Sequence, residues 1–476
     1  MDKIHDEELE RKQLKMVSLQ DIAEHQDIFQ RHLLTFLSKQ EVGRLQSVSK
    51  CLRSSFDDEN CWKVLFQRDF GIIGREAPEY NAHTRSFDSL SDQKKFKGAY
   101  QEWAKWQSQT CYAIQPRHMV IAIDIWTRCK TILKRKKLTK ILESLEPPPS
   151  REFFQRAAGK LPSSLVAFYA IHAGQSSLTP RSSDDDFFAG LFGSYSCYND
   201  FYSMRLLHVN EFSLDSVVNS IFIVGINLGM PRKSLVIDFG NKENPDGSVY
   251  ITQPQSHPHL PGVSRHLFCH NGILSYLQTY VERLESGIYE PCTIHPESPL
   301  SRGICLFPEK VSVAVTNGVE VRASARWFPE PGHGPMNFGY SIRICLAESD
   351  SRDGEVSCQL VDRNWEFHYE DGTINRVSGE GAVGKQPLFF RRNDRSTGFI
   401  DLGPAGNGET YTNTVFSYQS QSGPVPGSHS LDVLKTTNAR VRGTFSFRPG
   451  SIRKPTGPLF LVDVGEFPLH VELPFY

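Results

Sequence analysis

The stretch Asn364–Pro387, NWEFHYEDGTINRVSGEGAVGKQP, decides the fold of the C-terminal third of this chain. It contains Gly379-Glu-Gly381-Ala-Val-Gly384, which fits the G-x-G-x-x-G pattern of dinucleotide-binding proteins. That pattern predicts a nucleotide site only where it follows a strand and opens a helix whose N-terminus receives the pyrophosphate.

The residues around the glycines predict strands instead of that helix. Trp365–Tyr369 and Thr373–Val377 are short alternating runs joined at Glu370-Asp371-Gly372, a pattern typical of a β-hairpin. The segment after Gly384 is too short and too polar at its end for a crossover helix. We therefore expect the glycines to lie in a loop of a β-domain, with no Rossmann fold.

Length and composition indicate a multidomain globular protein. The 476 residues suffice for about three domains at ~150 residues each. A formal net charge of −1 provides no overall field that would favour nucleic acid or an anionic membrane. The first fifteen residues lack the apolar core of a secretory signal, and no apolar run is long enough to span a bilayer. We expect cytoplasmic and/or nuclear localisation, with no membrane and no nucleic-acid partner.

Residue types that bind metals are present, but their spacing is poor. The ten cysteines include no C-x-x-C pair and are expected to be reduced, mostly buried thiols. Asp184-Asp185-Asp186 are consecutive carboxylates in a Ser-rich segment, and His257-x-His259 lacks a third ligand. We expect no metal, no cofactor and no catalytic residue.

Residues 18–70 predict a small helical domain. Its three apolar stripes comprise Phe29, Leu33, Phe36 and Leu37; Val42, Leu45, Val48 and Leu52; and Trp62, Leu65 and Phe66. Ser38-x-x-Glu41 is a capping box for the second helix, and Asp57 or Asp58 is a cap for the third. Three short helices bury little surface alone, so the domain needs a partner or a neighbour.

Residues 71–110 are expected to be a helical connector, polar up to residue 95. Asp69-Phe70-Gly71 resembles a kinase D-F-G but lacks the other kinase motifs, and it predicts a helix end followed by Gly71. The later aromatic stripe Phe96, Tyr100, Trp103 and Trp106 predicts a core helix face. The basic run Lys134–Lys137 is expected on the solvated side of one helix that carries Leu138, Ile141, Leu142 and Leu145.

Residues 111–288 show a mixed helix and strand pattern. Helical sequence surrounds Leu161-Pro162, and strands are expected at 204–207, 222–224 and 234–238, the last pairing across Asp246-Gly247 with 249–251. A closing helix, capped by Asn271 and stopped by Gly287, carries Ile273, Leu277, Tyr280 and Leu284 on its apolar face.

Residues 289–303 are rich in proline and predict a linker, and residues 304–476 predict an all-β domain. Asn317-Gly318 lies between two alternating runs and is a strong hairpin signal. Many short strands with this spacing are typical of a sandwich.

Motifs in all three regions resemble known domain families. His32–Leu37, Val48-Ser49-Lys50 and Asn60-Cys61-Trp62 resemble an F-box. Leu161-Pro162, Tyr169…Gly174-Gln175 and Gly190-Leu191-Phe192-Gly193 resemble the SUKH (Smi/Knr-type) domain. Phe338–Ile344, Gln359–Trp365, Gly379–Pro387, Gly408–Tyr411 and Arg442–Phe445 resemble an ApaG domain.

This domain order resembles that of a family of SCF (Skp–cullin–F-box) ubiquitin-ligase substrate receptors. The resemblance implies a multidomain α+β protein with an N-terminal helical F-box, a central α/β SUKH-like domain and a C-terminal all-β, fibronectin-III-like ApaG sandwich. It further implies a non-catalytic subunit that binds a Skp-family adaptor, through it a cullin, and a target protein. We expect the adaptor to bind the apolar anchors Leu33, Leu34, Leu37, Leu45, Val48, Leu52 and Trp62.

Two other functions of the glycine loop stay open. Gly379, Gly381 and Gly384 could form an anion nest beside Lys385 and bind a nucleotide or pyrophosphate. Alternatively, the glycines only allow a backbone conformation, and the C-terminal domains are peptide-binding surfaces. We prefer the second interpretation because no acid, base or nucleophile accompanies the loop.

Overall fold

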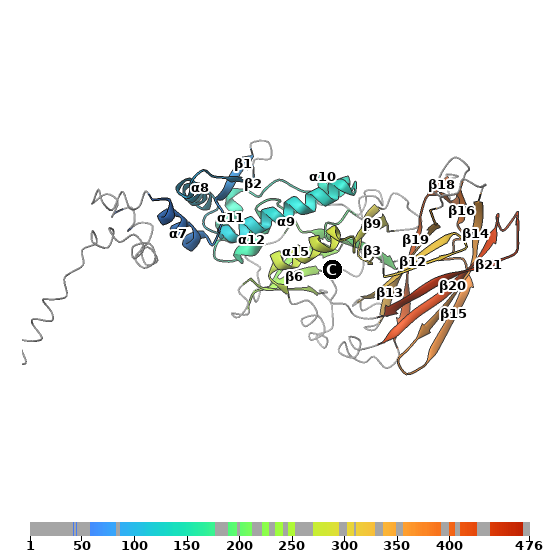
Figure 1. Ribbon diagram of the computed structural model, residues 1–476. Coiled ribbons are helices and arrows are strands. Elements are labelled where there is room, and N and C mark those ends of the chain that lie inside the picture. Colours follow the sequence, from blue (N-terminus) through green and yellow to red (C-terminus); the bar gives the residue numbers. More distant parts are fainter. Residues whose placement is uncertain are drawn as a thin grey trace, which may run out of the picture. The chain divides into compact units, whose positions relative to one another are not determined.

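The protein's structure, a computed structural model, forms two compact units. It describes residues 41, 44, 58–81, 86–176, 189–197, 200–211, 221–227, 234–240, 246–252, 270–294, 302–308, 311–328, 337–348, 356–391, 399–404, 410–425 and 438–469. Unit 1 comprises Met1–Asp124 and Pro147–Ile171, and unit 2 comprises Ile125–Glu146 and His172–Tyr476. Figure 1 labels their helices and strands.

Unit 1 is mainly helical. Its elements are α7 (Glu59–Phe70), β1 (Glu76–Asn81), β2 (Ser86–Asp92), α8 (Phe96–Gln109), the first part of α9 (Pro116–Arg135), α11 (Arg151–Ala157) and α12 (Ser163–Tyr169). The Asp58 side chain accepts a hydrogen bond from the Asn60 N–H and caps α7, as predicted. Gly71 ends the same helix at φ +67°, which confirms that Asp69-Phe70-Gly71 is a helix terminus.

Aromatic side chains of α8 form the core against α7. Tyr100, Trp103 and Trp106 are buried, as the stripe predicted, and Trp103 also donates from Nε1 to the Glu76 carbonyl at 2.8 Å. That carbonyl belongs to the antiparallel hairpin β1–β2, which lies within the predicted polar connector. The connector therefore contains two strands that the sequence analysis did not expect.

Unit 2 begins with an eight-stranded sheet, which we call the central sheet. Its order is β8-β7-β6-β5-β4-β3-β10-β9, antiparallel except for the parallel pair β3 and β10. The strands are β3 (Ser194–Cys197), β4 (Asp200–Leu206), β5 (Ile221–Asn227), β6 (Ser234–Asp238), β7 (Ser248–Thr252), β8 (His270–Asn271), β9 (Glu290–Thr293) and β10 (Arg302–Cys305). The helices of this part are α10 (Thr139–Glu143), α15 (Ile273–Glu285) and the second part of α9.

Several predictions for this region are confirmed. Strand β6 pairs with β7, and α11 and α12 flank Leu161-Pro162. Helix α15 buries Ile273, Leu277, Tyr280 and Leu284, as predicted.

Three predictions are wrong. Leu138–Leu145 does not continue the helix of the basic run, because α9 ends at Arg135 and Lys137 has φ +58° before α10 begins. Lys136 is not simply solvated, since its Nζ lies 2.6 Å from Glu290 Oε2. Asn271 does not cap α15, because it pairs in β8 and Gly272 takes the cap position.

The predicted proline-rich linker contains two paired strands. Strands β9 and β10 pair antiparallel, with Pro291 opposite Ile304, and they extend the central sheet. Strand β9 is at the sheet edge, where a residue without an N–H is tolerated. Ile304 therefore belongs to the central sheet, and the first strand of the next domain begins at Ser312.

The C-terminal part of unit 2 is a sandwich of two sheets (yellow to red in Figure 1). One sheet has the order β11-β12-β13-β19; the other has the order β18-β17-β16-β14-β20-β21, with β15 paired to β14. The strands are β11 (Ser312–Thr316), β12 (Val319–Phe328), β13 (Asn337–Leu346), β14 (Val356–His368), β15 (Ile374–Glu380), β16 (Leu388–Arg391), β17 (Phe399–Pro404), β18 (Thr410–Asn413), β19 (Phe416–Pro424), β20 (Ala439–Pro449) and β21 (Phe460–Leu469).

Aromatic rings fill the space between the two sheets. The Tyr340 ring of β13 lies 5.5 Å from the Trp365 ring of β14, and the Trp365 ring lies 5.6 Å from the Phe445 ring of β20. Both predicted hairpins are present, since Asn317 and Gly318 turn at positive φ and the Tyr369 N–H donates to the Thr373 carbonyl at 2.9 Å. The predicted all-β domain is therefore confirmed.

The outward side of β12, β13 and β19 is buried against the central sheet. We call this side the junction face; its buried polar residues are Ser324, Arg326, Ser341, Arg343 and Gln419. The Ser196 N–H donates to Gln419 Oε1 at 2.6 Å, and Gln419 Nε2 donates to Cys305 Sγ at 3.4 Å. Arg326 Nη1 donates to the Leu306 carbonyl at 2.7 Å. Polar bonds thus fix the sandwich to strands β3 and β10.

The buried Arg343 interacts with the thiols of Cys305 and Cys292. Burial opposes ionisation of the Cys305 thiol, but the hydrogen bond with Cys292 and the Arg343 guanidinium lower the pKa of Cys305 to about 6. The interaction with Arg343 thus favours the charged form of the Cys305 thiol, and a buried charge is tolerated when it is paired.

Loss of the Gln419 amide should weaken the junction. Gln419→Ala leaves the buried Ser196 N–H without an acceptor, which should lower the free energy of unfolding by about 2 kcal/mol. Urea unfolding of the full chain, followed by tryptophan fluorescence, measures this change. Gln386→Ala, at an exposed glutamine of the same domain, is the control and should shift the midpoint little. Equal midpoints for the two variants would contradict this role of Gln419.

Candidate functional site

Of the predicted adaptor-binding residues, the structure describes Trp62. Leu33, Leu34, Leu37, Leu45, Val48 and Leu52 lie outside the described residues. The Trp62 ring is half-buried, 5.3 Å from the Tyr100 ring and 5.6 Å from Lys97 Nζ. Trp62 therefore packs α7 against α8, and only part of its surface is open to a partner.

A buried glutamine organises the loops of the central domain. The Gln175 side chain is fully buried, with Nε2 donating to the Ala189 carbonyl at 2.9 Å and to Ser144 Oγ at 2.7 Å. Its Oε1 accepts from the N–H groups of Leu191 and Leu206, both at 2.9 Å. One side chain thus satisfies buried backbone groups from two separate segments.

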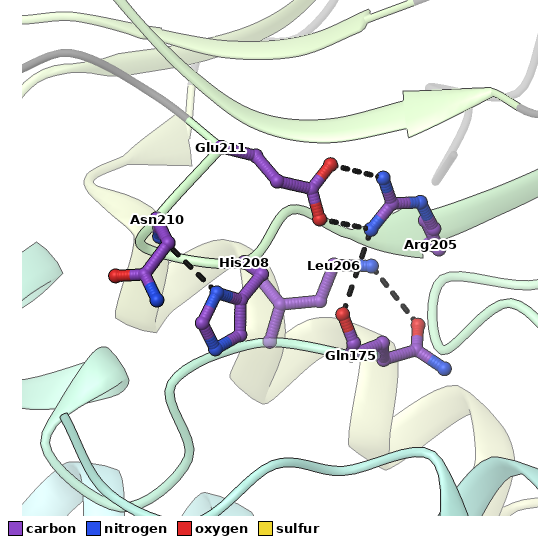
Figure 2. A network of polar contacts seen from close by, with 6 residues as sticks. All are labelled: Gln175, Arg205, Leu206, His208, Asn210 and Glu211. Carbon is purple, nitrogen blue, oxygen red and sulfur yellow. Dashed lines mark hydrogen bonds and ion pairs between the residues drawn. The ribbon is translucent and has the colours of Figure 1, made fainter. Parts of the chain in front are cut away.

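The residues around Gln175 bond one another and bring two chain segments together (Figure 2). Arg205 is buried, pairs with Glu211, and donates from Nη1 toward the Gln175 carbonyl at 3.5 Å. Gly174 has φ +130°, and a Cβ there would lie 2.4 Å from the His208 Cα. The Gly174-Gln175 motif therefore has a conformational explanation, because it allows one chain segment to approach another and to bond its backbone.

Gly381 and Gly384 lie in the loop that joins β15 to β16, as the sequence predicted. The prediction is wrong for Gly379, which lies in β15 and pairs with Arg363 of β14. The N–H groups of Gly381, Ala382 and Lys385 donate to the carbonyls of Val361, Lys385 and Ala382, respectively, at 2.7–2.9 Å. Arg363 Nη1 donates to the Glu380 and Gly381 carbonyls at 3.0 and 2.8 Å. These three N–H groups therefore already have acceptors within the domain.

Gly381 has a steric reason to be glycine. Its φ is +54°, and an added Cβ would lie 2.2 Å from the Lys385 carbonyl oxygen. Gly384 also has positive φ, but nothing lies within 4 Å of its added Cβ. The motif therefore maintains a tight turn, and its two turn glycines differ in how strictly they are required.

The outward face of the second sheet carries a charged cluster that the sequence analysis did not identify. Glu366 of β14 binds Arg376 of β15 at 2.9 Å, Arg442 of β20 at 2.7 Å and His368 at 3.2 Å. Hydrogen bonds from Arg376, Arg442 and His368 lower the pKa of Glu366 to about 2. The hairpin register set by Asp371-Gly372 aligns Glu366 with Arg376, so this pair could have been found from the sequence.

The metal predictions name residues that the structure does not describe. Asp184, Asp185, Asp186, His257 and His259 lie outside the described residues. Within the described ranges, no group of three or more His, Cys, Asp or Glu residues could hold a metal ion. No helix in those ranges combines the length and apolarity needed to cross a bilayer. The seven cysteines whose state the structure gives are free.

Comparisons with known proteins match both the C-terminal part of the chain and most of its length. Residues 329–394 match the family model described as the ApaG domain. The chain is 27% identical to F-box protein SKIP16 of Arabidopsis thaliana, over 94% of this chain and 98% of that protein. It is 22% identical to F-box only protein 3 of Bos taurus, over 78% of this chain and 67% of that protein. It is 31% identical to Protein ApaG of Anaeromyxobacter sp. (strain K), over 34% of this chain and 96% of that protein.

Removal of the Gln175 amide should destabilise the central domain. Gln175→Ala leaves the Leu191 and Leu206 N–H groups and the Ala189 carbonyl without their partner, which should cost about 3 kcal/mol. Thermal unfolding by circular dichroism tests this expectation. Gln278→Ala, whose exposed amide contacts Glu282 on α15, is the matched control and should change the melting temperature little.

The two turn glycines should respond differently to alanine. Gly384→Ala should cost about 1 kcal/mol, the price of a left-handed backbone for a residue with a Cβ. Gly381→Ala adds a clash with the Lys385 carbonyl and should cost about 3 kcal/mol. Urea unfolding of both variants gives the comparison. If Gly384→Ala were the more damaging variant, the steric explanation would be wrong.

Proposed function

Because the chain belongs to the F-box proteins that carry an ApaG domain, we propose that it is a substrate receptor of an SCF-type ubiquitin ligase. The observation that carries the proposal is the similarity to an F-box protein along nearly the full length of both chains. In this role the N-terminal helical domain binds a Skp-family adaptor, and through it a cullin. The central and C-terminal domains bind the target protein.

The receptor acts by proximity and needs no catalytic group or cofactor. A target held on the same complex as the ubiquitin-transferring subunits meets them at a high effective concentration. The junction face supports this role, since its bonds make the central sheet and the sandwich one compact body. A target bound on either domain would be presented by that whole body. We place this activity in the cytoplasm or nucleus.

The central domain is proposed to be SUKH-like and non-catalytic. Its Gly174-Gln175 and Gly190–Gly193 segments meet around the Gln175 amide, where their polar groups bond one another. Groups whose bonds are used within the fold support a protein-interaction module better than they support an active site.

Nucleotide or pyrophosphate binding by Gly379, Gly381, Gly384 and Lys385 is the alternative, and no observation favours it. Three N–H groups of the loop already donate to backbone carbonyls, and the Arg363 guanidinium bonds carbonyls of the same loop. We therefore assign the glycines to backbone conformation.

Adaptor binding should depend on the apolar anchors of the F-box-like domain. Leu34→Ala with Leu37→Ala should reduce co-purification of the full chain with a Skp-family adaptor by about tenfold or more, because both changes remove apolar surface that the complex would bury. Trp62→Phe should retain binding, since a phenyl ring can keep the packing on Tyr100.

The control for this experiment is Ile73→Ala, which removes an exposed apolar side chain outside the predicted anchors. It should co-purify like the unchanged protein. Undiminished adaptor binding by the double leucine variant, with normal unfolding behaviour, would refute the docking assignment.

A further inference from the structure

Strand β15 forms one side of a regular hairpin. It pairs with β14 from Asp362↔Glu380 to His368↔Ile374 without a register shift. Among the described residues, β15 has no second strand neighbour. Nearly every residue of β15 is exposed, so both of its faces as well as one edge are open to solvent.

The hydrogen bonds at the two ends of the hairpin show which backbone groups point outward. The Tyr369 N–H donates to the Thr373 carbonyl, and the Gly381 N–H donates to the Val361 carbonyl. Hydrogen-bonded and non-hydrogen-bonded pairs alternate along an antiparallel ladder. Residues 375, 377 and 379 therefore bond β14, whereas Ile374, Arg376, Ser378 and Glu380 point their backbone groups away from its backbone. The Glu380 carbonyl accepts from Arg363 Nη1, so the outward groups of the other three residues are the ones a partner strand could use. We call these four residues the β15 edge.

The edges at β11, β21 and β19 of the sandwich have contacts with other elements. Asn317 Nδ2 at the end of β11 approaches the Leu461 carbonyl of β21, and Thr316 Oγ1 accepts from the Asp463 N–H. The edge strand β19 is bonded to the central sheet through Gln419. These contacts follow the general rule that sheet edges are covered or otherwise blocked.

Among the described residues, the β15 edge has one such contact, from Arg363 Nη1 to the Glu380 carbonyl at one end of the strand. The strand INRVSGE contains no proline, no lysine and no bulge, and it exposes Ile374 and Val377 by 41% and 40%. Unpaired backbone groups on an exposed strand are complementary to another extended backbone. The β15 edge is therefore suited to bind a peptide segment in an extended conformation.

The charges along the edge select the side chains of that segment. Arg376 stands at the centre with 67% of its side chain exposed, and it shares Glu366 with Arg442, so the centre keeps an excess positive charge. The ends are acidic, with Asp371 in the turn and Glu380 directly opposite Asp362. An acidic residue flanked by basic residues complements this pattern in either strand direction.

A second copy of this chain fits the edge less well. Two copies of β15 paired about Arg376 would place like charges directly opposite each other, which is destabilising in a sheet. Pairing about Ser378 would instead place Arg376 opposite Glu380 of the second copy, but it would require the Glu380 carbonyl, which already accepts from Arg363 Nη1 at 3.0 Å.

We propose that the β15 edge binds an extended peptide segment of another protein by strand addition, with a carboxylate side chain opposite Arg376. This inference rests on the proposed function, since it assigns part of target recognition to this edge of the sandwich. Main-chain hydrogen bonds provide affinity, and the Arg376 cluster provides selectivity for acidic residues.

A defined peptide tests the proposal on the full chain. The probe is fluorescein-labelled Lys-Val-Thr-Val-Glu-Val-Thr-Val-Lys, whose lysines share the face of the central Glu. Fluorescence anisotropy should show saturable binding that weakens roughly fivefold when Arg replaces that Glu. The peptide is also N-methylated at its odd-numbered or at its even-numbered residues. One of these two peptides should lose binding, because alternate N–H groups of an added strand point toward β15, and the other should keep it. Absence of saturable binding up to about 1 mM, or equal effects of both methylation patterns, would overturn the proposal.

Protein variants locate the site. Ser378→Pro removes an outward N–H while leaving the ladder to β14 intact, and it should abolish peptide binding. Arg376→Glu should reverse the preference, so that the peptide with the central Arg binds better. Arg440→Glu, on the same sheet beside Glu466, is the matched control and should bind like the unchanged chain. Thermal unfolding establishes that each variant is folded.

Two further measurements separate the outcomes. Ser378→Pro should still co-purify with the Skp-family adaptor, so loss of peptide binding and loss of adaptor binding are distinguishable. Size-exclusion chromatography reports self-association. A dimer that Ser378→Pro dissociates, together with no peptide binding, would assign the edge to a second copy and overturn the proposal.

Discussion

Satisfying the hydrogen bonds of buried backbone groups is the constraint on which unit 2 depends. Two glutamine amides meet much of this requirement at different places. Gln175 joins the segments around Ala189, Leu191 and Leu206 within the central domain, and Gln419 joins the sandwich to Ser196. An amide carries both donors and an acceptor, so it can bond N–H and carbonyl groups together. Apolar packing alone would leave these groups unsatisfied, at a cost of about 1–3 kcal/mol each.

The same constraint explains how two sequence motifs, the glycine loop and Gly174-Gln175, are bonded in the structure. The glycine loop matches a cofactor pattern, yet its N–H groups bond neighbouring carbonyls. Gly174-Gln175 lies among buried polar groups that bond one another. A sequence motif does not show what its backbone N–H and C=O groups bond. Groups that bond other backbone atoms stabilise a turn, and groups without such partners can bind a ligand.

Local signals predicted the elements that local chemistry determines. Asn317-Gly318 and Asp371-Gly372 supply the positive φ their turns need, so both hairpins could be located from the sequence. The end of α9 could not, because Lys137 adopts positive φ without a glycine or proline to signal it. Asn271 is a favourable cap by type, but pairing with β7 takes it into a strand. Pro291 suggested a linker, because proline is usually excluded from strands. An edge strand tolerates it, but distant residues set the strand order that puts β9 at the sheet edge. The Glu366–Arg376 pair followed from a register that the predicted hairpin already contained, whereas Arg442 comes from β20.

The junction face has a consequence for how this protein evolves. A relative consisting almost wholly of the ApaG region is a separate protein, whereas in this chain β12, β13 and β19 turn one side toward the central sheet. Ser324, Ser341 and Gln419 lie on a strand side that a lone two-sheet sandwich would expose, but here they are interior positions. Surface substitutions are usually tolerated within about 0.5 kcal/mol, and interior ones are not. The fused sandwich should therefore accept fewer changes on this face than a free-standing one, and compensating changes should arise in pairs, one in each domain.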